Sequence, residues 1–328
     1  MTIKSSGSSL SFSEIEAEFG SNGSRSLGAY RLSQSVGSLS NLPLDSGVPT
    51  SGQIKFSDFY GKRLNIVVDC HSGGDQTRII AKNDKWNNNN LTVIGGFRSK
   101  KEGGSKIIIN VNKKFCSNKD ATDRCALRTG TWDGSSTVQV DLGSSARVLG
   151  SGGNGGNGAN GIDNSGGNGD TGTSGLGIQV NNCTVNVASG AIIRAGFGGG
   201  GGGGGGRQVD KGEDRRASGG GGGGGAGCPP GNGGSRGTTG SQGDDGSAGS
   251  ETAGGGGGGG GNNDNQAGGG SGGSGGQASG GAGNGGGSQT GGGSGGASGA
   301  AIRRNSGFSV TINNSGTIQG STSATGIS

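Results

Sequence analysis

Short apolar runs with polar punctuation occupy the first half of the chain. Between residues 62 and 150, the runs 64–69, 78–80, 91–94 and 106–111 are rich in Val and Ile, and clusters of Asn, Asp and Gly separate them. β-Branched residues favour strands, and the polar clusters favour turns. The pattern therefore predicts a small all-β unit that holds most of the apolar core.

A related pattern recurs in 137–150, 184–196 and 309–320. Each copy has an alternating strand, a turn, and a second short strand that ends on Gly. We expect each copy to form either one β-hairpin or one coil of a β-solenoid. The second copy leads into glycine-rich sequence and the third follows it, so the glycine region 197–299 reads as an insertion anchored at both ends.

Residues 1–61 carry two related motifs, 9–20 and 52–61, in which an extended stretch precedes Ser, an acidic residue, and an aromatic residue before Gly. Ser13 and Glu16 have capping-box spacing, which predicts a short helix that begins at Ser13. Such short modules bury little apolar surface alone, so we expect them to dock on another protein. The candidate docking residues are Phe12, Ile15, Phe19, Tyr30, Phe56, Phe59 and Tyr60.

Three uninterrupted glycine runs, 198–206, 219–225 and 254–261, are the most unusual feature of the chain. It has 89 Gly among 328 residues, and only 25% of its residues are hydrophobic. Uninterrupted glycine is required where backbones pack too closely for a Cβ atom, as at the axis of collagen. We therefore expect packed polyglycine-type helices with three residues per turn. The alternative is a flexible linker.

The expected fold class is all-β plus non-α/non-β. N-terminal docking modules would occupy 1–61, a β connector domain 62–150, and a glycine-rich head 151–328. In the head, β-hairpin or β-solenoid repeats would anchor a bundle of polyglycine-type helices.

Charge and composition narrow the function classes. The net charge is +5, but no basic stripe is interleaved with aromatic residues, so nucleic-acid binding is not expected. No segment approaches 18 consecutive apolar residues, which argues against a membrane span. Met1 precedes a polar stretch, so we expect synthesis in a cytoplasm without a signal peptide.

The five cysteines do not have metal-site spacing. The sequence has no Cys-x-x-Cys and one His, so we expect no metal and no cofactor. Cys116 and Cys125 flank a polar loop between apolar segments and are the expected disulfide pair. The odd number leaves at least one cysteine outside a disulfide within the monomer.

Candidate catalytic groups are weak. His71 adjoins Asp69 and Cys70, but a strand end accounts for this cluster more simply than a Cys–His pair. The carboxylate pairs 213–214 and 244–245 lie on glycine-flanked segments that lack the rigid support catalysis needs. We therefore expect a protein that is not an enzyme.

The glycine runs and the strand unit before them resemble the receptor-binding adhesins at the tips of tailed-bacteriophage fibres. The residues that carry the resemblance are 185–206, 219–225 and 254–261, and the N-terminal modules are similar to short repeats in phage tail proteins. The resemblance implies a protein of the virion, at the tail or tail-fibre tip, that is oligomeric there. Residues 1–61 would bind other tail or fibre proteins. In that family a polyglycine sandwich displays loops that recognise a bacterial surface receptor, an outer-membrane protein or a glycan.

By this analogy, the loops 207–218, 226–253 and 262–267 would contact the receptor. Their charged and amide residues are the candidate receptor-binding groups: Arg207, Asp210, Lys211, Glu213, Asp214, Arg215, Arg216, Arg236, Asp244, Asp245, Asn262, Asn263 and Asp264. The alternative function is a purely structural tail or baseplate protein whose glycine bundle bridges subunits. An ice-binding role is disfavoured by the irregular charged loops.

Overall fold

The computed structural model describes most of the chain. The described residues are 3–19, 26–30, 47–49, 51–62, 66–70, 76–77, 79–80, 91–94, 106–117, 124–130, 137–161, 164–210, 213–261 and 290–327.

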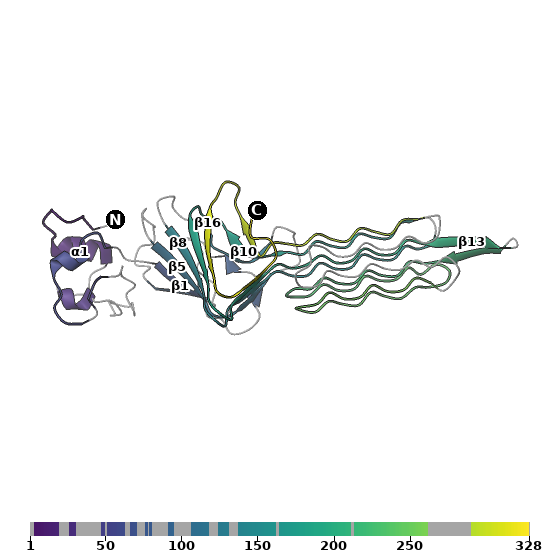
Figure 1. Ribbon diagram of the computed structural model, residues 1–328, viewed down its shortest axis with the longest axis horizontal. Helices are drawn as coiled ribbons and strands as arrows, with labels where there is room; N and C mark the ends of the chain where they lie inside the picture. Colours follow the sequence, from purple (N-terminus) through teal and green to yellow (C-terminus); the bar gives the residue numbers. More distant parts are fainter. Residues whose placement is uncertain are drawn as a thin grey trace.

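Three sheets form the central part of the molecule (Figure 1). The first sheet has the order β16 (Val310–Asn314), β11 (Cys183–Val187), β8 (Thr137–Leu142), β5 (Lys106–Val111), β1 (Ile66–Cys70), β4 (Leu91–Ile94). The second has the order β17 (Thr317–Gln319), β12 (Ile192–Arg194), β9 (Arg147–Leu149), β6 (Lys114–Cys116), β2 (Gln76–Thr77). The third has the order β18 (Ala324–Thr325), β15 (Ile302–Arg304), β10 (Ser174–Ile178), β7 (Cys125–Arg128), β3 (Ile79–Ile80).

The chain winds through these sheets as a three-sided solenoid. Successive strands visit the first, second and third sheets in turn, so β5, β6 and β7 make one coil and β8, β9 and β10 make the next. Neighbouring coils pair in parallel, and β4 is antiparallel to β1. The three sequence repeats lie on successive coils in register, with Val185 opposite both Val140 and Ile312. The hairpin alternative is therefore wrong, because the two strands of each repeat lie in different sheets.

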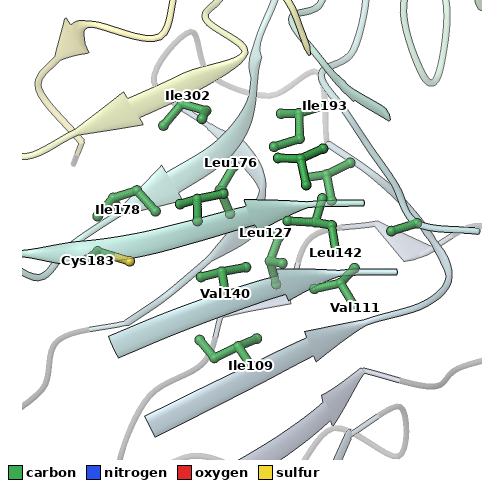
Figure 2. Packing of buried hydrophobic residues seen from close by; sticks show 14 of the residues in the cluster. Ile109, Val111, Leu127, Val140, Leu142, Leu176, Ile178, Cys183, Ile193 and Ile302 are labelled. Atoms are coloured by element: carbon green, nitrogen blue, oxygen red, sulfur yellow. The ribbon is translucent and has the colours of Figure 1, made fainter. Parts of the chain in front are cut away.

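The apolar core fills the interior of the solenoid. In β5, burial alternates along the strand, and Ile107, Ile109 and Val111 are fully buried. Because neighbouring strands are in register, these side chains lie next to the corresponding residues of β8, and the same rows continue through later coils (Figure 2). Fully burying one such side chain contributes about 1.5–3 kcal/mol, so the rows stabilise the stack of coils.

The expected domain boundary at residue 150 is wrong. The core includes Leu176, Ile193 and Ile302, which belong to β10, β12 and β15. These strands extend the sheets that begin in 62–150. The β unit and the glycine-rich region are thus interleaved along the chain, because the solenoid resumes after each glycine excursion.

The N-terminal module has its own small core. Its elements are the helix α1 (Phe12–Phe19) and the 3₁₀ helices η1 (Leu27–Tyr30) and η2 (Phe56–Phe59). The first cap is Ser11 and not Ser13: the Ser11 amide donates to Glu14 Oε2 at 2.8 Å, and the Glu14 amide donates to Ser11 Oγ at 3.3 Å. The predicted capping pair, Ser13 with Glu16, is therefore wrong, and the same Ser-x-x-Glu spacing two residues earlier makes the cap.

Several predicted docking residues are instead core residues of this module. Ile15, Tyr30 and Phe59 are fully buried against one another. Phe56 is 39% exposed, and its ring meets that of Phe12 edge to face at 6.1 Å between centroids. Tyr60 is half-buried, and the Phe19 side chain lies outside the described part.

Within the described residues, no helix has the length and apolar character to span a bilayer.

Candidate functional site

A bundle of extended, glycine-rich segments leaves the solenoid at one edge. Residues 150–173 make one excursion between β9 and β10, and residues 195–301 make another between β12 and β15. Both excursions start after a strand of the second sheet and return to a strand of the third. The segments therefore run side by side away from the same corner of the solenoid (Figure 1).

Hydrogen bonds between these segments repeat every three residues. Gly199 and Gly202 donate to the carbonyl oxygens of Asp170 and Gly167 at 2.9 and 2.8 Å. The intervening Gly200 donates to Gly223 O at 2.8 Å, on a different neighbour. Each segment thus bonds a given neighbour at every third residue. Some neighbours are antiparallel, as 199–202 is to 167–170, and others are parallel, since Gly153 and Gly156 donate to Phe197 O and Gly200 O.

The first two pure glycine runs are the centre of the bundle. Every residue of 198–206 and 219–225 is buried. A Cβ on Gly199 would lie 1.9 Å from the carbonyl oxygen of Asn154, and a Cβ on Gly222 would lie 2.1 Å from that of Gly200. No side chain fits such a distance. The backbone contact inferred from the sequence is present, and the linker alternative is wrong for these two runs.

The third run, 254–261, lies on the outside. A Cβ on Gly258 would be 2.0 Å from the carbonyl oxygen of Asp244, whereas a Cβ on Gly256 would meet nothing within 4 Å. Gly256 and Gly259 are exposed. Packing therefore requires glycine at only some positions of this run.

The far end of the bundle carries a β-hairpin. β13 (Gly206–Asp210) pairs antiparallel with β14 (Glu213–Ala217), and β13 lies at the end of the molecule opposite the N-terminal module (Figure 1). The register places Arg207 opposite Arg216 and Asp210 opposite Glu213. The expected loop 207–218 is thus mostly a hairpin, because backbone pairing continues beyond the glycine segments.

A turn lies beside this hairpin. Thr239 and Gly240 are exposed, and Gly240 has a φ of +74°, which favours glycine. The Ser218 hydroxyl donates to the Thr239 carbonyl oxygen, and Ser241 bridges to Ala217 at the end of β14. The hairpin and the turn together form the tip, defined here as residues 206–210, 213–217 and 239–241.

The prediction that 226–253 is one exposed loop is wrong. The Gly231 amide donates to Gly225 O, and the Gly246 amide donates to Gly234 O, both at 2.9 Å. These bonds make most of this region two packed segments that run out to the turn and back. Arg236, Asp244 and Asp245 are exposed, but they lie along the side of the bundle.

The structure brings some predicted receptor-binding residues together at the tip. These are Arg207 and Asp210 in β13, and Glu213, Asp214, Arg215 and Arg216 in β14. Along the side, the Arg236 amide donates to Asp245 Oδ1 at 2.8 Å. Lys211, Asn262, Asn263 and Asp264 lie outside the described residues.

A disulfide holds the bundle to the solenoid. Cys116 at the end of β6 bonds to Cys228, and both are buried against Leu149. The expected Cys116–Cys125 pair is wrong. Between these residues the chain turns from the second sheet to the third, which takes Cys125 into β7, where it is buried outside the disulfide. The segment returning from the tip brings Cys228 to Cys116 instead.

An ionic contact lies beside this disulfide. Glu251 Oε2 is 2.8 Å from Lys114 Nζ, and its Oε1 is 3.2 Å from the Nη2 of buried Arg194. Burial alone would raise the pKa of Glu251. The hydrogen bond and charge of Lys114, with the charges of Arg194 and Arg147, outweigh burial and hold this pKa below its ordinary value of 4.5.

Glu251→Gln should weaken the attachment of the bundle in a pH-dependent way. Because the folded-state pKa is below the unfolded one, the carboxylate contributes stability above about pH 4.5 and loses it as the pH falls through the folded value. We expect the variant to lose about 1–2 kcal/mol of unfolding free energy at pH 7 and less at pH 3. Denaturant unfolding at both pH values measures this difference. Asp245→Asn, on an exposed side position, is the control, and an equal loss at both pH values would contradict the ionic account.

The residues that the structure describes bear on the metal site and the Cys–His cluster considered from the sequence. Among them, no group of three or more His, Cys, Asp or Glu side chains could hold a metal ion. Cys70 ends β1 as a buried residue, and His71 lies outside the described part.

Sequence reasoning missed two anchoring residues, Cys228 and Glu251. The pair Pro229-Pro230 directly after Cys228 marks a chain reversal, which was the available signal for a segment that returns to the solenoid. Glu251 had no local signal, because its partners lie in β6 and β12.

Comparison with known protein families gives a match to the phage tail fibre adhesin Gp38 over residues 76–323, which is more than half of the chain. The chain belongs to this family. It is thus a bacteriophage adhesin of the tail fibre that acts in host attachment, and its place is the virion tail. The resemblance seen in the glycine runs is confirmed. Membership indicates a structural and binding protein.

Two further comparisons complete the picture. Among solved structures, the chain is similar to the crystal structure of the gp37–gp38 adhesin tip complex of the bacteriophage S16 long tail fiber, at 20% identity and a TM-score of 0.37. The similarity covers 96% of this chain and 98% of that chain. Curated proteins give no match.

Proposed function

We propose that this adhesin recognises a host cell-surface receptor through its tip, at the end of packed polyglycine-type helices. The observation that carries the proposal is the placement of the charged hairpin β13–β14 at the far end of a bundle whose own contacts are between backbones. The packing that supports the hairpin therefore comes from backbone contacts of the glycine segments.

The spacing of the hydrogen bonds supports the helix assignment. A three-residue repeat with extended backbone is the geometry of the polyproline II class, to which polyglycine helices belong. Each glycine segment is hydrogen-bonded to several neighbours and retains little conformational freedom. The bundle can therefore hold the hairpin at a fixed distance from the solenoid. A rigid support favours binding, because less ordering entropy is lost on contact.

The N-terminal module is the proposed mount. In the S16 complex, gp38 is found with gp37 at the adhesin tip. By analogy, residues 1–61 would associate with another tail or fibre protein, in an oligomeric assembly. Phe56 and Phe12 form an aromatic pair at the surface of the module and are suited to this contact. Aromatic residues are enriched at the centres of protein interfaces.

Exchanging residues 207–216 for the corresponding segment of an adhesin with another host range should transfer that host range. The test is adsorption of otherwise identical phage to the two hosts, with virion incorporation of the full-length chain measured in parallel. Lys113→Gln, an exposed substitution on the solenoid, serves as the control and should leave adsorption unchanged. Normal incorporation with unchanged host range would instead favour the structural function, in which the bundle bridges subunits.

A further inference from the structure

Asparagine recurs at every third position of segment 150–161, at residues 154, 157 and 160. All three side chains contact the same neighbouring segment, 229–238. In each case the side-chain Oδ1 accepts a backbone N–H from across the interface. The pairs are Asn154 with Asn232 at 3.0 Å, Asn157 with Ser235 at 2.9 Å, and Asn160 with Thr238 at 2.7 Å. Each pair is separated by 78 residues, so the contacts form a ladder of constant register.

The backbone hydrogen bonds between segment 229–238 and segment 219–225 do not by themselves choose a register. Gly231 and Gly234 donate to Gly225 and Gly222, three residues further back each time. A slip of three residues past 219–225 would remake this pattern, because Gly231, Gly234 and Gly237 present the same surface to that segment after each turn. Register is weakly specified in glycine-rich extended segments for the same reason.

Such a slip would move the turn 239–241 relative to the hairpin. At about 3.1 Å per residue, three residues correspond to a shift of about 9 Å along the bundle. The turn 239–241 follows this segment directly, and its contacts with Ser218 and Ala217 require its present position. Register and tip geometry are therefore coupled.

We propose that Asn154, Asn157 and Asn160 are positioning residues that fix the register of segment 229–238 and so hold the turn 239–241 beside β14. The disulfide at Cys228 fixes the solenoid end of the same segment, while the ladder acts along its length. The ladder does not depend on what the tip binds. Its failure and a failure of receptor binding are therefore separate results.

The side-chain chemistry gives a sharp substitution series. Alanine removes the acceptor oxygen, whereas aspartate places a carboxylate oxygen where the amide oxygen of asparagine was. Asn157 and Asn160 are the better positions for aspartate, because Asn154 also donates through Nδ2 to Asp170 Oδ2 at 3.0 Å. Asn168 offers a matched control on another edge, where its Oδ1 accepts the Ser294 amide at 2.9 Å.

Hydrogen exchange of the full-length protein tests the ladder directly. In N157A/N160A, the amides of Ser235 and Thr238 should exchange about tenfold faster, while those of Gly234 and Gly237 stay protected. N157D/N160D should retain protection at all four amides, and Asn168→Ala should expose only the Ser294 amide. Unchanged protection of Ser235 and Thr238 in the alanine variant overturns the proposal, as does equal loss in the aspartate variant. If N157A/N160A does not fold, the single substitution Asn160→Ala is measured at Thr238 with the same expectation.

The distance between two labelled residues reports the register of segment 229–238. Thioether-linked spin labels on Lys113→Cys and Thr239→Cys, both exposed positions, report the separation of the turn from the solenoid. Under reducing conditions, the labelled chain with all three asparagines should give one separation. The labelled N154A/N157A/N160A variant should add a second population displaced by about 9 Å. One shared separation in both chains would show that register is set elsewhere, and would overturn the assignment.

Discussion

Gly222→Ala will prevent the glycine bundle from packing, whereas Gly256→Ala will leave it folded. The new Cβ at residue 222 would lie 2.1 Å from the carbonyl oxygen of Gly200, and both atoms belong to buried backbone. Neither side can rotate away, so the two central segments must separate along their length. We expect a loss of more than about 4 kcal/mol, which is at the upper end of single-substitution effects. Denaturant unfolding of the two full-length variants measures the loss.

Gly256→Ala is the matched control because it is the same substitution in the same kind of run. Its Cβ would meet nothing within 4 Å. Replacing glycine by alanine also reduces the freedom of the unfolded chain, so we expect a gain of about 0.4–1 kcal/mol. Similar losses at both positions would show that the central runs are not held by backbone contact.

Cys116→Ala/Cys228→Ala should be the second strongly destabilised variant. The bond closes a sequence separation of 112 residues that includes the entire path from β6 to the returning glycine segment. For a loop of about 100 residues, the chain-entropy model gives about 4.7 kcal/mol. We expect a loss of this size in unfolding free energy, with the bundle end of the chain becoming sensitive to protease before the solenoid does.

Reductant supplies the internal control for this variant. Reducing the wild-type chain should lower its stability to that of the double variant, which lacks the bond and should not respond to reductant at all. A reductant effect of equal size in both chains would locate the sensitivity outside the Cys116–Cys228 bond.

The part of the fold that follows from local sequence was predictable. The repeats at 137–150, 184–196 and 309–320 indicated either hairpins or solenoid coils, and the structure shows coils. Backbone packing of 198–206 followed from the absence of any side chain. These features depend on residues that are neighbours in sequence or repeat with a short period.

The features that were missed depend on contacts between residues far apart in the sequence, or on a regular glycine spacing that the residues between obscure. Glycine recurs at 231, 234 and 237, and again at 243, 246 and 249, with the three-residue spacing also present at 152, 155 and 158. The charges and prolines of 226–253 conceal it. The disulfide partner of Cys116 could not be found locally, because it is delivered by a segment that first travels to the tip.

The cross-bonding of the glycine segments also has a mechanical consequence. The N-terminal module and β13 lie at opposite ends of the long axis, and the segments between β13 and the solenoid run along it (Figure 1). Bonds such as those from Gly199, Gly200 and Gly202 join segments side by side. A pull between the two ends therefore loads them together in shear and does not open them one after another, so the bundle resists a force applied along the long axis.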